Sequence, residues 1–169
     1  MRLFDFEFGF FQIVENLLRA LIKSVAIFGQ GQTASCSLEH PMVEQGKLSQ
    51  PLSPETKLQQ LSEEDYGAMV AEVFDRPAEF LNREIEVASV EMTMPEIAAA
   101  FSLVLGKTVE YQQIPFEAFE QQAGEEVTIM YRWFENVGYG ADLAQLKRDF
   151  PSSSDFESYL RDHDWTKPD

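Results

Sequence analysis

The sequence has few of the residues that build disulfides or metal centres. Its 169 residues include one cysteine, Cys36, and two histidines, His40 and His163. A single cysteine excludes an intramolecular disulfide, which fits a reducing, cytoplasmic location. The histidines lie far apart in the sequence, with no cluster of cysteine or carboxylate at ligand spacing. We therefore expect no metal site.

Basic residues and long apolar runs are also scarce. The chain has 13 Lys and Arg against 29 Asp and Glu, a formal net charge of −16. Such a charge repels phosphate backbones and anionic membrane surfaces, so nucleic acid and membranes are unfavourable partners. Charged residues from Asp5 to Lys23 interrupt the apolar N-terminal stretch before it reaches the roughly 18 residues of a membrane span. We expect one acidic, cytoplasmic globular unit.

One short stretch resembles a cofactor turn. Residues 25–34, VAIFGQGQTA, indicate a β-branched strand that runs into two glycines. Such a turn binds a dinucleotide because it brings backbone N–H groups and a helix N-terminus to the pyrophosphate. Here Pro41 follows before a full helix can form, and the acidic residue expected about 20 positions later would be Glu55, in a proline-rich turn. Gly29 and Gly31 are the cofactor-binding candidates, but their context favours a loop.

The residue pairs that catalyse reduction or acyl transfer are missing from the sequence. A short-chain reductase places a lysine four residues after a tyrosine acid, because the positive charge lowers the pKa of the phenol. The positions four residues after the five tyrosines hold Val70, Pro115, Glu135, Leu143 and His163. The chain also has no Gly-x-Ser-x-Gly nucleophile elbow. We assign no catalytic residue, and this favours a protein that is not an enzyme.

From Leu61 onward the sequence alternates between helix and strand patterns. Ser62 and Thr93 are predicted N-caps of two amphipathic helices, which end before Pro77 and at Gly106. Alternating polar and apolar residues predict strands in REIEVA, residues 83–88, and VEYQQIP, residues 109–115. Further helices are predicted around Phe116 and Phe119 and over residues 127–137, 142–150 and 155–162. These elements predict an α/β fold.

The N-terminal stretch has a different pattern. Phenylalanines alternate with other residues from Phe4 to Phe10, which indicates a strand. Apolar residues then recur at helical spacing from Ile13 to Ile22, which indicates a helix ending near Lys23. Loops or short extended pieces are expected between Gly31 and Leu61 because several prolines occur there.

The helix predicted over residues 127–137 concentrates aromatic side chains. It carries Tyr131, Trp133 and Phe134, and Tyr139 follows it. Aromatic helix faces are usually buried, so we expect most of this cluster to lie in the core. The polar side of the helix is expected to carry Thr128, Arg132 and Glu135. If the chain binds a small molecule, the four aromatic residues are our candidates for the pocket wall.

Four segments of the chain resemble a known family in order and spacing. They are GKLSQPLSPETKLQQLSEEDYGAMVAEVF, FLNREIEVASVEMTMPEIAAAFSLVLGK, VEYQQIPFEAFEQQAGEE and MYRWFENVGYGADLAQLKRDFP. Together they resemble the C-terminal part of NmrA-like proteins, which are atypical members of the short-chain dehydrogenase/reductase superfamily. The helix starts at Asp65-Tyr66-Gly67 and at Thr93, and the helix from Met130 to Gly138, carry most of the resemblance.

The resemblance implies an N-terminal Rossmann domain that binds NADP(H) or NAD(H), and a smaller C-terminal part that covers the cofactor cleft. The family's glycine motif belongs far upstream of the matched segments, so most of the Rossmann domain is expected to be absent. We expect residues 1–45 to be a divergent segment, weakly ordered or built of a strand and a helix. Residues 46–169 are then the NmrA-like C-terminal domain of a truncated or rearranged family member.

Three functions remain open at this point. The first is an NAD(P)(H)-linked redox sensor or regulator that does not bind the dinucleotide alone. The second is an oxidoreductase that is active only with a separate Rossmann partner. The third is a small-molecule binding module. Because a lid surface left uncovered is apolar, either a Rossmann-domain protein or a second copy is an expected partner.

Overall fold

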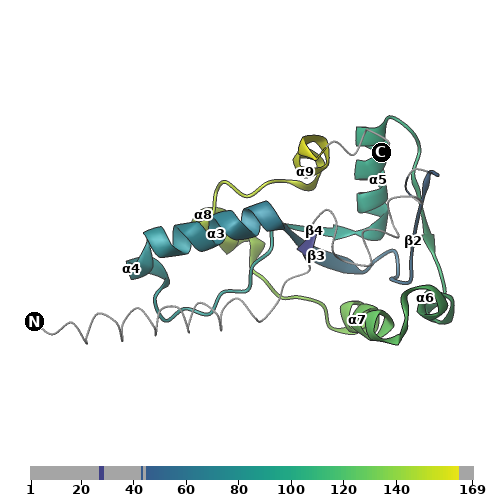
Figure 1. Ribbon diagram of the computed structural model, residues 1–169, viewed down its shortest axis with the longest axis horizontal. Helices are drawn as coiled ribbons and strands as arrows, with labels where there is room; N and C mark the ends of the chain where they lie inside the picture. The colour runs from purple at the N-terminus through teal and green to yellow at the C-terminus, as the bar shows by residue number, and fades with distance from the viewer. Residues whose placement is uncertain (1–26, 29–42, 44, 164–169) are drawn as a thin grey trace, which may run out of the picture.

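The computed structural model describes residues 27–28, 43 and 45–163 and gives this part of the chain an α/β fold (Figure 1). One sheet contains β1 (Ile27–Phe28), β3 (Lys57–Ser62) and β4 (Val90–Thr93) in the order β1-β3-β4. β1 is parallel and β4 antiparallel to β3. A second sheet pairs β2 (Lys47–Gln50) in parallel with β5 (Glu110–Gln113).

Several sequence predictions fall partly or wholly outside this range. Of the strand predicted in residues 25–28, β1 is the described part. The strand and helix predicted before it, and the glycines Gly29 and Gly31, lie outside the described residues. No described helix combines the length and apolar character needed to cross a membrane.

Helix α3 (Glu63–Asp75) begins and ends where the sequence indicates. The Ser62 hydroxyl accepts a hydrogen bond from the Asp65 amide at 3.0 Å, which satisfies one of the free N–H groups of the first turn. The helix stops before Pro77, which opens the one-turn helix α4 (Pro77–Phe80). The apolar stripe of α3 is only partly buried, because Met69 is in the core while Phe74 at the end of the helix is exposed.

Helix α5 (Met94–Leu105) is capped at both ends. Thr93 and Glu96 form the predicted capping box, in which each side chain accepts a hydrogen bond from the backbone of the other. Gly106 ends the helix with φ +64°, a conformation that suits glycine. Its apolar face is buried, with Ile97 and Phe101 in the core.

Helices α6 (Phe116–Ala123) and α7 (Glu125–Asn136) follow β5, and α8 (Leu143–Asp149) and α9 (Phe156–Asp162) close the described part. The closing helices match the predicted ones. Figure 1 shows α3, α4 and α8 at one end of the molecule and α5, α6 and α7 at the other, with β3 and β4 between them.

The prediction of a strand over residues 83–88 is wrong. This segment does not form a strand, because β3 pairs with residues 90–93 instead. The predicted alternation still appears in the exposure of the side chains: Glu84 and Glu86 are exposed, whereas Ile85 and Val87 are partly buried. The pattern therefore reports packing against α8 rather than hydrogen bonding in a sheet.

Two hydrophobic cores hold these elements together. The first core gathers most of the buried residues, from β2, β3, α5, α6, α7 and α9, and Phe101 packs edge-to-face on Phe156 at 5.7 Å between ring centres. The second core is smaller and lies among β3, α3, α4 and α8. Its buried members are Leu61, Met69, Phe80, Leu146 and Phe150.

Candidate functional site

The four predicted pocket residues divide between the core and the surface. Tyr131 and Phe134 are buried in the first core, with their ring centres 5.5 Å apart. Trp133 is 40% exposed, and Tyr139 is partly buried with its ring centre 4.9 Å from that of Trp133. A molecule outside the core would therefore contact Trp133 and Tyr139 but not the other two. Burial raises the pKa of Tyr139, so its phenol is neutral at physiological pH.

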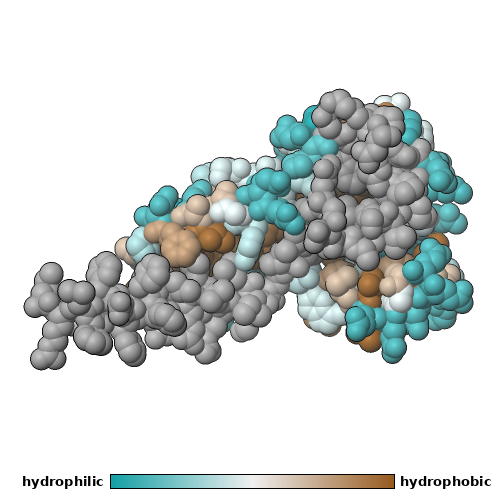
Figure 2. Space-filling view, in the orientation of Figure 1, coloured by the Kyte–Doolittle hydropathy of each residue, from teal (hydrophilic) through white to brown (hydrophobic). Residues whose placement is uncertain are grey.

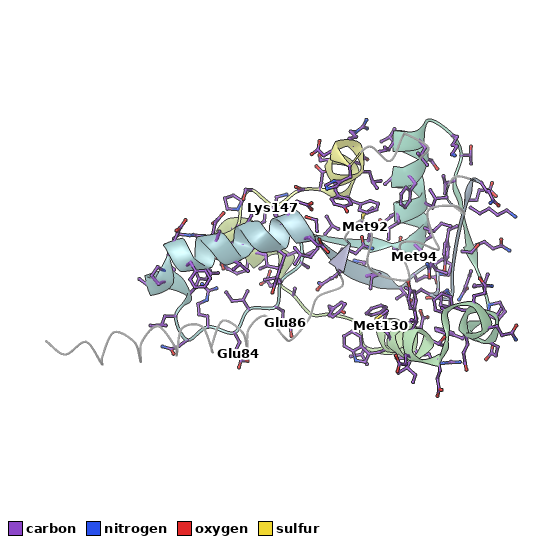
Figure 3. All side chains as sticks on the ribbon, in the orientation of Figure 1. Glu84, Glu86, Met92, Met94, Met130 and Lys147 are labelled. Carbon is purple, nitrogen blue, oxygen red and sulfur yellow. The ribbon has the colours of Figure 1, made fainter. Side chains whose placement is uncertain are left out.

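Helix α7 and the residue that follows it also expose apolar side chains, among them Trp133 of the aromatic cluster. The exposed set is Ile129 (60%), Met130 (42%), Trp133 (40%) and Val137 (69%). Three of these lie at i, i+3 and i+7 from Met130, so they share one helix face. Figure 2 shows apolar surface at α7 beside hydrophilic side chains, and Figure 3 labels Met130 on this helix.

The prediction that Thr128 lies on the polar side of α7 is wrong. Thr128 is 2% exposed, because its hydroxyl donates to the Gly124 carbonyl at 2.8 Å and leaves only the methyl group to pack inward. The buried face of α7 is therefore rotated from the one that hydrophobicity alone predicts. Tyr131 and Phe134 lie on that buried face and the exposed apolar residues lie opposite.

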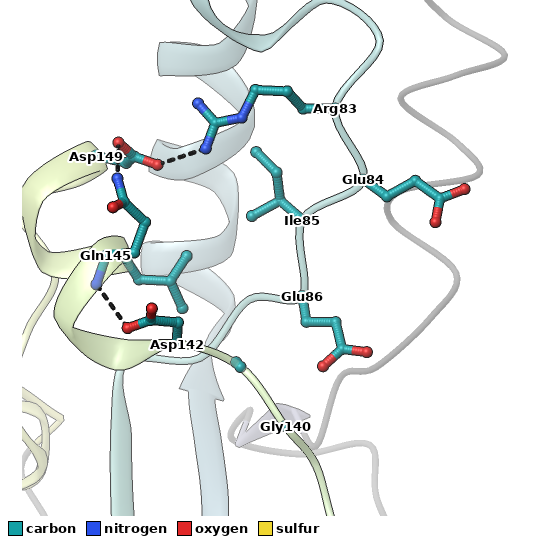
Figure 4. A pocket seen from close by; sticks show the side chains of 10 residues that line it. Arg83, Glu84, Ile85, Glu86, Gly140, Asp142, Gln145 and Asp149 are labelled. Carbon is teal, nitrogen blue, oxygen red and sulfur yellow. Dashed lines mark hydrogen bonds and ion pairs between the residues drawn. The ribbon is translucent and has the colours of Figure 1, made fainter.

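A groove with a volume of about 390 Å³ lies between residues 83–86 and the start of α8. Figure 4 shows Ile85 pointing toward α8 while Glu84 and Glu86 point away from it. The far end of the groove is tied by the ion pair between Arg83 and Asp149 at 2.9 Å. The groove thus has an apolar floor and an acidic rim.

A small polar cluster lies where the two cores meet. The buried carboxylate of Asp65 accepts hydrogen bonds from the Ser89 hydroxyl at 2.5 Å, from the Ser154 amide at 3.1 Å and from the Ser154 hydroxyl at 3.2 Å. Gln60, 2% exposed, lines the same cavity of about 20 Å³, and its side-chain amide has no hydrogen-bond partner among the described residues. A space of that size fits about one water molecule.

The hydroxyl group of Tyr111 has a structural role. The Tyr111 hydroxyl donates toward the carbonyls of Gln50 and Leu52, which ties β5 to the end of β2. Burial, helped by the negative charge of Glu135, raises the pKa of Tyr111 well above its usual value. A phenol held in the neutral form in this way is a poor acid–base catalyst near neutral pH.

Each described helix from α3 to α9 begins with a carboxylate at the cap or in the first turn. A pyrophosphate binds where free N–H groups at a helix N-terminus face an anion. A carboxylate at that position repels phosphate, and Asp142 of α8 and Asp155 of α9 also accept hydrogen bonds from the first-turn N–H groups. These carboxylates, at the cap or in the first turn, are Glu63, Glu64, Asp65, Glu79, Glu96, Glu117, Glu125, Glu126, Asp142, Asp155 and Glu157.

Metal binding also has no support in the described part of the chain. Within residues 27–28, 43 and 45–163, no group of three His, Cys, Asp or Glu side chains lies close enough to hold an ion.

The α/β fold of the described residues resembles part of several solved structures. A Staphylococcus aureus nucleoside-diphosphate-sugar epimerase is 17% identical with a TM-score of 0.60, over 75% of this chain and 48% of the epimerase. Triphenylmethane reductase from Citrobacter sp., solved with NADP(H), is 15% identical with a TM-score of 0.55, over 76% of this chain and 49% of the reductase. NmrA, a negative transcriptional regulator solved with NADP, is 21% identical with a TM-score of 0.50, over 72% of this chain and 47% of NmrA.

The family itself follows from the sequence match. The model of the NmrA-like family matches residues 14–160, so this chain belongs to the NmrA-like family. A Dictyostelium discoideum NmrA-like family domain-containing protein is 28% identical over 102 residues, which are 58% of this chain and 33% of that protein. The chain thus spans about a third of that relative and about half of the solved structures. The family match begins at residue 14, inside the segment 1–45 that the sequence pattern set apart.

Sequence reasoning missed the groove and the Asp65 cluster. The groove had one signal, the alternation that turns Ile85 inward, but it was assigned to a strand. The Asp65 cluster joins residues 24 and 89 positions apart in the sequence, and no local pattern reports such a contact.

Proposed function

We propose that this chain is the substrate-side part of an NAD(P)(H)-linked redox sensor or regulator, and that it does not bind the dinucleotide alone. The observation that carries the proposal is the set of carboxylates at the described helix starts. NADP(H) is bound by structural neighbours such as NmrA and triphenylmethane reductase. In this chain the described helix starts carry carboxylates, which repel phosphate, so we assign the dinucleotide to a Rossmann domain outside the described residues.

Two surfaces support a partner of that kind. In the part of the chain that the structure describes, β1 is the edge strand of its sheet, so a further parallel strand would pair with it. The exposed apolar face of α7 around Trp133 would then be covered by the same partner or by a ligand between the two. A second copy of this chain is the alternative partner.

The substrate side of the site, in this proposal, is the aromatic edge of Trp133 and Tyr139. Both rings are accessible, and they meet at a centre-to-centre distance of 4.9 Å. Such an edge offers a flat apolar contact without a charged group, and no described tyrosine has a lysine four residues later. The chain would therefore hold a ligand near the cofactor without transferring a proton to it.

Calorimetric titration of NADPH into the purified chain tests the proposal, with NADH as comparison. Near-UV circular dichroism first establishes that the sample is packed. The expected result is no saturable heat. Saturable binding at micromolar concentration that is lost in Gly31→Val would contradict the proposal and restore residues 25–34 as a cofactor turn.

A second experiment separates a sensor from an enzyme. The Rossmann domain of an NmrA-like relative is added to the chain with NADPH, and absorbance at the nicotinamide band is followed. A sensor binds the domain without oxidising NADPH. Turnover that requires both components would instead show an oxidoreductase that is reconstituted from two parts.

A further inference from the structure

One buried amide group lies beside the Asp65 cluster, where the two cores meet. Gln60 of β3 is 2% exposed and lines the cavity of about 20 Å³ there. Within residues 27–28, 43 and 45–163, neither its Nε2 nor its Oε1 has a hydrogen-bond partner. A buried amide without partners destabilises the folded state, because it has lost its hydrogen bonds to water. Such a group points to a ligand that completes its hydrogen bonds.

We propose that this cavity binds one ordered water molecule, which links the Gln60 amide by hydrogen bonds to the serine hydroxyls beside Asp65. The volume of about 20 Å³ holds one molecule of that size. A water molecule both donates and accepts hydrogen bonds, and so does a primary amide, so water can serve either polar atom of the Gln60 side chain.

The serine hydroxyls supply the remaining partners of the water. Ser89 and Ser154 line the cavity, and their hydroxyls donate to the Asp65 carboxylate at 2.5 and 3.2 Å. A hydroxyl that donates its proton keeps its oxygen lone pairs as acceptors. The cavity wall therefore offers one amide donor, one amide acceptor and two hydroxyl acceptors, and a buried water needs two to four such partners.

The carboxylates of the cavity wall are already engaged, which favours a neutral ligand over an ion. Asp65 accepts from three donors, the Ser89 hydroxyl and the amide and hydroxyl of Ser154. The carboxylate of Asp155 accepts from the first turn of α9. A cation in the cavity would leave Nε2 of Gln60 unpaired. An anion would leave Oε1 unpaired and would be repelled by Asp65.

Apolar residues complete the wall of the cavity. Leu61, Val90 and Phe156 line it, and their side chains offer no hydrogen-bonding group to the Gln60 amide. Leu61 and Phe156 are also buried, so they shield the cavity from solvent. A water molecule held there exchanges slowly with the bulk and bridges β3 to Ser154, in the segment that leads into α9.

Magnetic relaxation dispersion of the water oxygen nucleus tests the proposal, because it counts the water molecules that stay bound while the protein tumbles. Gln60→Met removes the amide and keeps a side chain of similar length, so the full chain should lose one long-lived water. Gln59→Met is the matched control, because the Gln59 amide already bonds to the backbone of Ala141 at 3.0 and 2.9 Å; its count should equal that of the wild type. Near-UV circular dichroism establishes that each variant is folded. Equal counts in the wild type and in folded Gln60→Met would overturn the proposal.

A second readout uses the wild-type chain and needs no variant. Nuclear Overhauser effects between water and the side-chain amide protons of Gln60 should have opposite signs in the laboratory and rotating frames, as expected for a water that tumbles with the protein. The absence of these signals would overturn the proposal. Exchanging sodium chloride for choline chloride at constant ionic strength should leave the midpoint of thermal unfolding unchanged. A midpoint that rises with sodium in the wild type but not in Gln60→Met would assign the cavity to a cation and would also overturn the proposal.

Discussion

The two hydrophobic cores of the chain differ in size and in closure. The first core takes side chains from six elements and packs its rings edge to face, as in the pairs of Phe101 with Phe156 and Tyr131 with Phe134. The second has five buried residues and opens through Ile85 onto the groove. The described residues therefore close the first core by themselves, while the second needs further cover.

The way each core is reinforced differs accordingly. In the second core the rings of Phe80 and Phe150 stack with their centres 5.4 Å apart. The guanidinium groups of Arg76 and Arg83 lie 4.9 and 5.1 Å from the centre of the Phe80 ring. Arg76 also pairs with Glu72 at 2.5 Å. Such partly exposed charged contacts are each worth little. Apolar burial thus stabilises the first core, and a mixture of rings and charges shields the second.

The largest expected effect is the truncation of the first core. Phe101→Ala should lower the free energy of unfolding by about 3–5 kcal/mol, because it removes a fully packed ring and leaves a cavity. Urea denaturation measures the change. Leu103→Ala, on the exposed side of the same helix, should cost less than about 1 kcal/mol. Equal effects of the two variants would mean that α5 does not anchor the first core.

The next effect concerns the junction between the cores. Asp65→Ala should cost about 2–3 kcal/mol, because the donors of Ser89 and Ser154 lose a charged, buried acceptor. Amide hydrogen exchange measured at increasing temperature should show that the amides of α3 lose protection at a lower temperature than those of α5. Glu63→Ala, at an exposed position of the same helix turn, is the control and should change stability by less than about 0.5 kcal/mol. Simultaneous loss in α3 and α5 would show that the two cores unfold as one unit.

A smaller effect is expected from the cap of α5. Thr93→Ala should cost about 1 kcal/mol, because the Thr93 hydroxyl accepts from the Glu96 amide and also donates to the Glu96 carboxylate at 2.9 Å. Urea denaturation of the variant beside Thr108→Ala, an exposed threonine outside the helix, measures it. A cost of the same size in both would indicate a general effect of losing a threonine and not a capping effect.

The elements near caps and stops were predictable from sequence because their signals are local. Ser62, Thr93 and Gly106 act through groups within three or four residues of themselves, and the pattern reports them correctly. The strand over residues 83–88 was wrong because alternation records which side chains are buried and not which backbone groups pair. A half-buried extended segment and a strand therefore look alike.

The candidate site was less predictable for a related reason. From Val127 to Val137 seven of the eleven residues are apolar or aromatic and they are spread around the helix, so hydrophobicity alone does not select the buried face. In the structure Tyr131 packs on Phe119 of α6 with the ring centres 4.7 Å apart, and Tyr131 and Phe134 both belong to the first core, whose other members come from distant parts of the sequence. Trp133 is exposed on the opposite side as a consequence.

The smallest effect is expected from an ion pair between Glu64, at the start of α3 in the second core, and His163, at the end of α9 in the first core. His163 lies beside Glu64 with Nε2 3.1 Å from the carboxylate, and its Nδ1 is 2.8 Å from the Tyr159 carbonyl. Burial opposes protonation of the ring, but these hydrogen bonds and the charges of Glu64 and Asp162 outweigh it and raise the pKa of His163. The pKa of Glu64 is lowered, chiefly by a backbone hydrogen bond and then by His163.

The sign of the pH effect follows from these two shifts. The raised pKa of His163 adds stability that is complete below about pH 6.5 and is lost as the pH rises through the folded-state value. The lowered pKa of Glu64 adds stability that is complete above about pH 4.5. The pair therefore contributes most between these limits, by about 0.5 kcal/mol, since Glu64 is largely exposed. In urea denaturation, the free energies of unfolding of the wild type and of His163→Gln should differ by this amount at pH 5.5 and become equal at pH 8.5. A difference that does not change with pH would show that the ion pair between His163 and Glu64 does not stabilise the contact between the two cores.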